Sequence, residues 1–326
     1  MLADRRRLNV AKMWVPRVTW RQKAAIQRAV ASLPARIGGR LYYALQRTAG
    51  GLRHVDPEDR FRAALEMAQR LEAHGGSLVG GTVLELGTGW RLNVPLALWL
   101  LGAQRVVTVD IHRYLRLALV QRDLAALRAA PERFATLFGR YGATAGFRRR
   151  FDQLLAFRST GAELLRLTGI EYLAPADAAR LPLADQSVDA HVSFTVLEHI
   201  PPDKLIAILH ESQRVLRPQG RLVHCIDFSD HSAHSDPSIT FVNFLQYDEA
   251  AWARLAGNRF AFHNRLRVDE FKALLDASGV TTIVLDSSVP DARSMTALEA
   301  GLPLAARFRD KPPRVNAVQQ AWLVGR

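Results

Sequence analysis

The sequence predicts an α/β protein whose core is a mainly parallel sheet with helices on both faces. Short apolar stretches of strand length alternate with stretches of helical pattern along most of the 326 residues, an order typical of βαβ units. One of these strands runs into a turn with two glycines, Gly87 and Gly89, and a strongly apolar helical stretch follows. The hydrophobic fraction of 48% is ordinary for a globular protein.

The first βαβ unit carries most of the information. Its strand leads through Glu85 to the turn at 87–89, where glycines let the backbone approach a ligand without side-chain obstruction. We expect Asn93 to cap the helix that follows. The next strand, 105–109, ends at Asp110, whose carboxylate can accept hydrogen bonds from a ribose diol. The unit therefore predicts a ligand of the nucleotide type.

The glycine pattern distinguishes between two kinds of nucleotide site. A dinucleotide-binding unit needs a third small residue in G-x-G-x-x-G, and here that position is Leu92. The acid at Glu85, two residues before Gly87, instead resembles the first motif of class I S-adenosylmethionine (SAM) methyltransferases, acid-x-G-x-G-x-G. The chain departs from that motif at Arg91, where the last glycine is expected. An unspecialised βαβ turn remains the alternative for this stretch alone.

Later motifs extend the resemblance. After the first unit come D-A-x-x-L-P from Asp177, S-V-D from Ser187, V-L-E-H-I from Val196 and V-L-R-P-x-G-R-L from Val215. Their order closely resembles that of small-molecule class I methyltransferases. The further expected strands are 170–173, 187–194, 221–228, 281–285 and 320–324, and the expected helices are 203–216 and 268–278. The resemblance implies a Rossmann-like sheet of seven strands with an antiparallel last strand.

The same resemblance implies SAM as the cofactor and indicates its contacts. Asp110 pairs with the ribose hydroxyls, Asp177 meets the adenine amine, and Ala178 offers a backbone amide. Glu85 helps to hold the glycine turn. The full set of expected cofactor-binding residues is Glu85, Gly87, Thr88, Gly89, Asp110, Ile111, Asp177, Ala178 and Phe194.

The expected catalytic residues follow the fourth and fifth strands, whose carboxyl ends face the ligand crevice in this kind of sheet. His231 is the first candidate for a general base and His199 the second, with Asp227 nearby. A histidine suits the removal of a hydroxyl proton near neutral pH. His231 and His234 could instead bind a divalent metal with carboxylates such as Asp230. We assign no metal ligands from the sequence, and an ordinary surface loop is the structural alternative.

The chain divides into a basic N-terminal helical segment at 1–75 and a methyltransferase domain at 76–326. Within the domain we expect a helical insertion at 112–168, made of three amphipathic helices that pack on the core or on a second subunit. An aromatic substrate-side region is expected at 229–267. Glycine pairs at 38–39 and 50–51 are expected to interrupt the N-terminal helices.

The net charge of +13 is concentrated in two segments. Residues 1–75 hold 15 basic and 6 acidic residues, and residues 111–169 hold 11 and 4, whereas the rest of the chain holds 18 and 21. One interpretation is that the two segments form one face beside the crevice and that this face contacts an anionic membrane surface or an anionic acceptor. The other is a coding bias toward arginine, since only 5 of the 44 basic residues are lysine.

The single cysteine, Cys225, lies in an expected core strand and leaves no intramolecular disulfide. The basic start lacks the apolar segment of a signal peptide, and the longest apolar run, 94–103, is far shorter than the ~20 residues that span a bilayer. We therefore expect a cytoplasmic protein, peripheral at the inner membrane surface where its basic segments bind lipid. A homodimer is compatible with the insertion.

Three function classes follow. The favoured one is transfer of a methyl group to a small-molecule or carbohydrate acceptor, at a hydroxyl, and the arrangement of the chain resembles bacterial methyltransferases of surface-polysaccharide synthesis. A nucleic-acid methyltransferase is the alternative that the basic segments permit, although the sequence has neither an Asn/Asp-Pro-Pro-aromatic clamp nor a Pro-Cys nucleophile. A non-catalytic scaffold with this fold is the third class, and against it the acids and glycines of the first motif are present.

Overall fold

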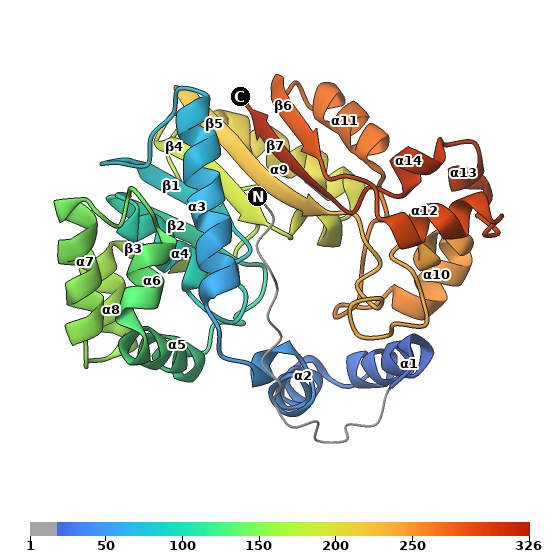
Figure 1. Ribbon diagram of the computed structural model, residues 1–326, viewed down its shortest axis with the longest axis horizontal. Helices are drawn as coiled ribbons and strands as arrows, with labels where there is room; N and C mark the ends of the chain where they lie inside the picture. The colour runs from blue at the N-terminus through green and yellow to red at the C-terminus, as the bar shows by residue number, and fades with distance from the viewer. Residues whose placement is uncertain (1–17) are drawn as a thin grey trace.

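The computed structural model describes residues 18–326, which form a single sheet of seven strands flanked by helices (Figure 1). The strands are β1 (Thr82–Leu86), β2 (Arg105–Val109), β3 (Ile170–Leu173), β4 (Val188–Phe194), β5 (Leu216–Asp227), β6 (Thr282–Ser287) and β7 (Gln320–Gly325). Their order across the sheet is β3-β2-β1-β4-β5-β7-β6. The pairs among β1 to β5 are parallel, and β7 runs antiparallel to both β5 and β6. The predicted sheet, with its antiparallel last strand, is confirmed.

The central strands are apolar on both sides because helices cover both faces. On one face the sheet packs against α3 (Glu58–Ala73) and α4 (Asn93–Leu100), and on the other against α9 (Pro202–Val215) and α11 (Val268–Ala277). All eight residues of α4 are buried, since this helix lies between the sheet and further helices. This position explains why its sequence shows no polar face.

The end of α11 agrees with the sequence prediction, whereas the start of α4 does not. Helix α11 is followed by Gly279 with a φ of +74°, the left-handed conformation expected of a glycine after a helix. The predicted cap of α4 is wrong by one residue, because Asn93 is the first residue of the helix and Leu92 occupies the cap position. The side chain of Asn93 is almost fully buried and does not cap the helix.

The insertion between β2 and β3 contains four helices where three were expected. They are α5 (Leu117–Ala129), α6 (Pro131–Leu137), α7 (Ala145–Ala156) and α8 (Gly161–Thr168). The extra boundary arises at Thr160, whose side chain and that of Glu163 form a capping box that starts α8. Phe134, Phe138 and Phe147 from this insertion extend the core beside α3 and α4.

The N-terminal part of the described chain forms α1 (Trp20–Ala31), α2 (Ala35–Thr48) and the short 3-10 turn η1 (Gly51–Arg53). The expected interruption at 38–39 is wrong, because both glycines lie inside α2 and the helices are separated at Pro34 instead. A Cβ on Gly38 would lie 2.6 Å from the carbonyl oxygen of Val30, so this glycine allows α2 to approach α1 closely. Trp14 and the basic residues before position 18 lie outside the described residues.

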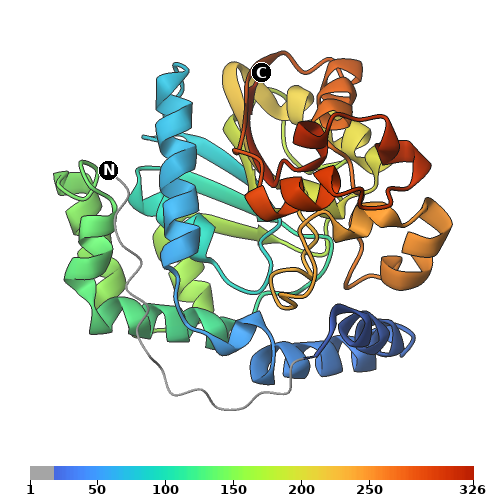
Figure 2. The ribbon, with the colours of Figure 1, turned by 45° about the vertical axis from the view of Figure 1, so that its right-hand side comes forward.

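Helices α1 and α2 lie across the edge of the sheet where the parallel strands end, next to α10 (Glu249–Ala256) (Figures 1 and 2). The remaining elements are η2 (Leu197–His199), η3 (Asn243–Gln246), α12 (Ala292–Glu299), α13 (Ala306–Arg309) and α14 (Pro313–Asn316). None of the helices formed by residues 18–326 combines the length and the apolar character that crossing a membrane requires.

The two basic segments meet in the described chain, where the guanidinium carbon of Arg116 lies 5.3 Å from the ring centroid of Tyr43 on α2, but, contrary to expectation, they do not form one continuous face. Helix α7, which carries Arg148 and Arg149, lies at the opposite side of the molecule from α1 in both views (Figures 1 and 2). Arg150 on the same helix is partly buried, stacks over the ring of Trp99, and donates to the carbonyl oxygen of Ala103 at 2.9 Å. Arg150 therefore ties α7 to the end of α4 and is not available to an anionic partner.

Candidate active site

The glycine turn after β1 is shaped by two different requirements. Gly87 has a φ of +89°, and a Cβ there would lie 2.4 Å from Cγ2 of Val196, so the residue must be glycine for the turn to pack against the loop after β4. Gly89 has a φ of +63°, and among residues 18–326 no atom lies within 4 Å of where its Cβ would be. The backbone at Gly89 is therefore open to a ligand.

Glu85 is connected to this turn through the hydroxyl groups of Thr108 and Thr88. The hydroxyl of Thr108 on β2 donates to Glu85 Oε2, and the Thr88 and Thr108 hydroxyls are 2.5 Å apart. Burial raises the pKa of Glu85 to about 7, although the hydrogen bond from Thr108 opposes that shift. Glu85 thus joins β1, β2 and the turn.

Asp110 closes the turn from the neighbouring strand. One carboxylate oxygen accepts the amide of Gly89 at 2.9 Å, and the other accepts the amide of His112 at 2.9 Å. Burial raises the pKa of Asp110, and these two amides oppose the rise. Each oxygen keeps a second lone pair with which it can accept a ligand hydroxyl. Ile111 beside it is 66% exposed, an apolar surface at the same edge.

The other expected cofactor residues lie on the loops that follow β3 and β4. Asp177 is exposed and accepts a hydrogen bond from the amide of Ala179 at 2.9 Å, which fixes the turn, while Ala178 is buried. Phe194 ends β4, and its ring lies 4.7 Å from the guanidinium carbon of Arg60. The sheet therefore brings all nine expected residues to the edge where its parallel strands end.

A row of aromatic rings that the sequence did not single out as a site joins α2 to this edge. The ring centroids of Tyr43 and Trp90 are 5.2 Å apart, and those of Trp90 and Tyr114 are 4.8 Å apart. Tyr42 stacks at 4.1 Å on Phe260 from the expected substrate-side region. Helix α2 thereby connects the glycine turn with the acceptor side of the site.

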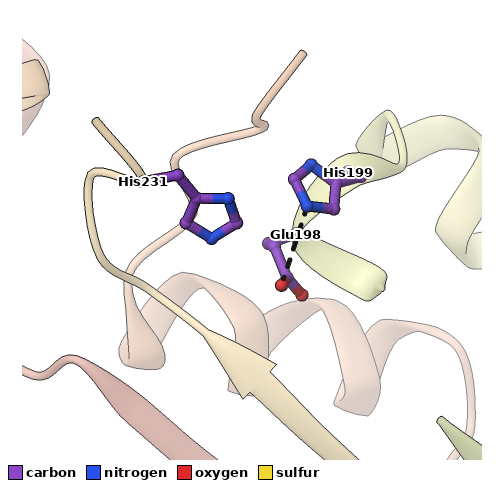
Figure 3. A group of neighbouring side chains, drawn as sticks. All are labelled: Glu198, His199 and His231. Atoms are coloured by element: carbon purple, nitrogen blue, oxygen red, sulfur yellow. Dashed lines mark ion pairs between the residues drawn. The ribbon is translucent and has the colours of Figure 1, made fainter. Parts of the chain in front are cut away.

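The expected catalytic residues come together in one histidine cluster, which we define as His199, His231, His234 and His263. The ring of His231 lies 4.9 Å from that of His199 and 5.3 Å from that of His263. Figure 3 shows His199 and His231 approaching from two different loops, one after β4 and one after β5. Asp227, the last residue of β5, places a carboxylate oxygen 3.3 Å from His231 Nε2.

One close ion pair and two hydrogen bonds orient the groups of the cluster. Burial alone would raise the pKa of Asp227, but its pairing with His231 outweighs burial and lowers the pKa to about 2. His199 Nδ1 lies 2.8 Å from the carbonyl oxygen of Phe262 and donates to it, which leaves Nε2 as the free nitrogen. His263 is buried, and its Nδ1 accepts the amide of Arg265 at 2.9 Å.

Glu198 and His263 belong to this site, although sequence reasoning did not select them. Glu198 is 1% exposed, and within residues 18–326 neither of its carboxylate oxygens has a hydrogen-bond partner. Burial raises the pKa of Glu198 well above its usual range. In the sequence, the adjacent Glu198-His199 pair after an apolar strand is the one local sign of this part of the site. The burial of Glu198 depends on residues more than sixty positions away. One of them is Asn264, whose side-chain amide donates to the carbonyl oxygen of Leu197 in η2 at 2.9 Å.

Comparison with known proteins gives a family match and several remote structural similarities. The sequence of residues 153–224 matches the protein family described as the methyltransferase domain. No curated protein matches the chain. Solved structures that resemble it include a SAM-dependent methyltransferase from Mesorhizobium loti (15% identity, TM-score 0.40, covering 79% of this chain and 96% of that one). Another is geranyl diphosphate C-methyltransferase from Streptomyces coelicolor A3(2) (13%, 0.44, 80% and 78%).

A third similar structure is a SAM-dependent methyltransferase from Methanosarcina mazei (16% identity, TM-score 0.44, covering 78% of this chain and 95% of that one). The matched family segment runs from α7 through β3, β4 and α9 into β5, and the sheet order, the open glycine turn and the buried acid after β2 accompany it. The sheet therefore has the class I methyltransferase fold, and its segment 153–224 matches the methyltransferase domain family.

Proposed function

We propose that the protein is a SAM-dependent methyltransferase whose acceptor is a small molecule, of the size of a saccharide or smaller. The methylated atom is a hydroxyl oxygen held against the histidine cluster. The observation that carries this proposal is the Asp227–His231 pair at the carboxyl end of β5, with Asp227 Oδ2 3.3 Å from His231 Nε2. A carboxylate that orients an imidazole leaves its second ring nitrogen as a proton acceptor. A hydroxyl is the acceptor that needs such a group.

In this proposal the cofactor-side residues position the methyl donor and the cluster prepares the acceptor. SAM supplies an electrophilic methyl group on a sulfonium. With its Nε2 turned toward Asp227, His231 takes the hydroxyl proton at Nδ1 as the new carbon–oxygen bond forms and the carbon–sulfur bond breaks, its electron pair going to sulfur. Asp227 stabilises the protonated imidazole that results. His199, with Nε2 free, is the second candidate for the same role.

The nine cofactor-binding residues expected from the sequence hold SAM in this proposal. Asp110 takes the ribose hydroxyls with its remaining lone pairs, the open backbone at Gly89 admits the ligand, and Ile111 covers part of it. Glu85, Gly87 and Thr88 hold the turn, while Asp177, Ala178 and Phe194 border the adenine end and the far side of the pocket. These residues fit a nucleoside-bearing donor because the acid and the open turn lie side by side.

Asp110→Ala tests the cofactor site. Loss of a charge-assisted, two-point contact with the ribose should weaken SAM binding by about 2 kcal/mol, roughly 30-fold. Isothermal titration calorimetry with SAM and S-adenosylhomocysteine measures the change, and NAD should not bind. Asp152→Ala, at an exposed position on α7, is the matched control. Because Asp110 also holds Gly89, the thermal stability of both variants is recorded, and unchanged SAM affinity in a folded Asp110→Ala protein contradicts the assignment.

We also propose that α1 and α2 bind an anionic membrane surface and so bring the site close to an acceptor there. Residues 18–54 contain seven Lys and Arg and no Asp or Glu. On α2, Ile37 and Leu41 are 57% and 42% exposed, and Arg36 and Arg40 flank them. Apolar side chains bordered by arginines on an exposed helix face are typical of helices that lie in a membrane interface. The inner face of α2 is occupied by Tyr42 and Tyr43.

Vesicle sedimentation tests this surface. Arg36→Ala combined with Arg40→Ala should weaken binding to phosphatidylcholine vesicles that contain phosphatidylserine by about 2 kcal/mol, roughly 30-fold, since each basic residue near such a surface contributes about 1 kcal/mol. Ile37→Ser with Leu41→Ser should also weaken it. Val289→Ser, which removes an exposed apolar side chain elsewhere, should not. Equal binding by all variants, or equal binding to neutral vesicles, rules the membrane role out.

A further inference from the structure

We infer that Glu198, His199 and His231 form a binding site for a divalent transition-metal ion (Figure 3). Each of the three side chains offers one ligand atom, and these atoms all lie within 4.8 Å of one another. They come from η2 and from the loop after β5, so the site lies at the edge of the sheet where the acceptor is proposed to bind. Two histidines and one carboxylate are a common ligand set for such ions.

The buried carboxylate of Glu198 is the strongest indication. It is 1% exposed, and in the described part of the chain its two oxygens receive no hydrogen bond. A buried carboxylate without hydrogen bonds is costly in either protonation state, because its oxygens lose water and gain nothing in return. A bound cation would supply the missing partner. The guanidinium group of Arg60 is instead engaged with the Thr195 hydroxyl, at 3.3 Å, and with the ring of Phe194.

The two histidines are already oriented as metal-binding histidines are. His199 donates from Nδ1 to the carbonyl oxygen of Phe262 at 2.8 Å, which leaves Nε2 free, and Nε2 lies 3.9 Å from Glu198 Oε1. His231 Nε2 lies 3.3 Å from a carboxylate oxygen of Asp227. A ligand histidine usually gives its second ring nitrogen to a carbonyl or a carboxylate in this way. Asp227 and Phe262 would then be the outer partners that fix the ring orientations.

The donor set favours Zn²⁺, Co²⁺, Mn²⁺ or Fe²⁺ over Mg²⁺, which prefers an all-oxygen environment. In a tetrahedral site with bonds of about 2.1 Å, ligand atoms are about 3.4 Å apart, so ion binding should draw the three side chains closer than the 4.8 Å span seen here. Three protein ligands leave a position open. This inference rests on the proposed function for its acceptor, a hydroxyl, which would bind the ion at the open position and lose its proton to water. In the metal-bound protein His231 would be a ligand, in place of the base that it provides in the metal-free protein.

The experiment uses the full chain, freed of metal with a chelator, and measures binding without any turnover. Zn²⁺ is titrated by calorimetry, and bound Co²⁺ is detected by its visible absorption. Glu198→Gln keeps the shape of the side chain and removes its charge, and we expect it to weaken Zn²⁺ binding by more than about 100-fold, since changes to outer partners alone cost about 10–100-fold. Glu299→Gln, at an exposed position on α12, is the matched control and should bind as the unaltered chain does.

His199→Ala gives a second route, because this residue is partly exposed and its loss is less disturbing to the core than a change at Glu198. It should remove the Co²⁺ absorption while circular dichroism and SAM affinity stay unchanged. Failure of the unaltered chain to bind Zn²⁺ or Co²⁺, or binding that survives both variants, overturns the metal site. Methyl transfer by the metal-free protein would leave the proposed function standing while showing that the ion is not needed for it.

Discussion

His231→Ala should reduce methyl transfer by about 10²–10⁴-fold while leaving SAM affinity within about twofold of the unaltered value. The loss follows because His231 is the ring that Asp227 orients, with a separation of 3.3 Å from Nε2 to Oδ2. The ring lies on the acceptor side of the site, and the turn that the cofactor is proposed to occupy is held by Glu85 and Asp110 instead. Calorimetry with SAM and initial rates with an acceptor separate the two effects.

The neighbouring His234→Ala is the matched control. Its Nε2 is 3.9 Å from the same Asp227 oxygen, and its side chain is more exposed than that of His231. We expect it to retain most of the turnover. Asp227→Asn, which keeps the shape but not the charge, should fall between the two variants. If SAM affinity drops as much as turnover in His231→Ala, the residue supports the cofactor pocket, and if neither changes, the loop after β5 is not catalytic.

Arg267→Ala should lower the free energy of unfolding by about 3–5 kcal/mol, the largest stability effect we expect from a single substitution. Arg267 is completely buried, and burial lowers its pKa to about 10. Its guanidinium group donates to three carbonyl oxygens, those of Phe228 at 2.6 Å and of Asn316 and Val318 at 2.7 Å. Removing it leaves these oxygens buried without partners, at a cost of about 1–3 kcal/mol each before relaxation.

Urea denaturation followed by circular dichroism measures this loss. Arg309→Ala, an exposed arginine on α13, should change the stability by less than about 0.5 kcal/mol. Arg267→Lys keeps the charge but not the planar set of donors, so we expect an intermediate loss. If Arg267→Ala lowers the free energy of unfolding by less than about 1 kcal/mol, water replaces the guanidinium group, and the hydrogen bonds of Arg267 do not hold the end of β5 to the segment before β7.

Much of the fold follows from local patterns in the sequence. The strand 170–173 has the same bounds in the structure, and the helix after Arg267 stops where Gly279 predicts. The glycine turn is likewise a local feature, because its positive φ angles and the acid before it act within a few residues. The expected helix boundaries are wrong where a second local signal competes with the apolar pattern, as at Thr160, where a capping box divides one expected helix into two.

The candidate site depends on contacts that no local pattern contains. The histidine cluster assembles because β4 and β5 are adjacent and parallel, which brings the loops after Phe194 and Asp227 together, and because the segment before α11 then supplies His263. The same packing buries Glu198 without hydrogen bonds and makes Gly38 a helix contact instead of a break. Periodicity and turn chemistry act over a few residues, so they determine the strands and the glycine turn. Burial and the pairing of charges are properties of segments brought together by the sheet, and they decide which histidines and acids can act as one site.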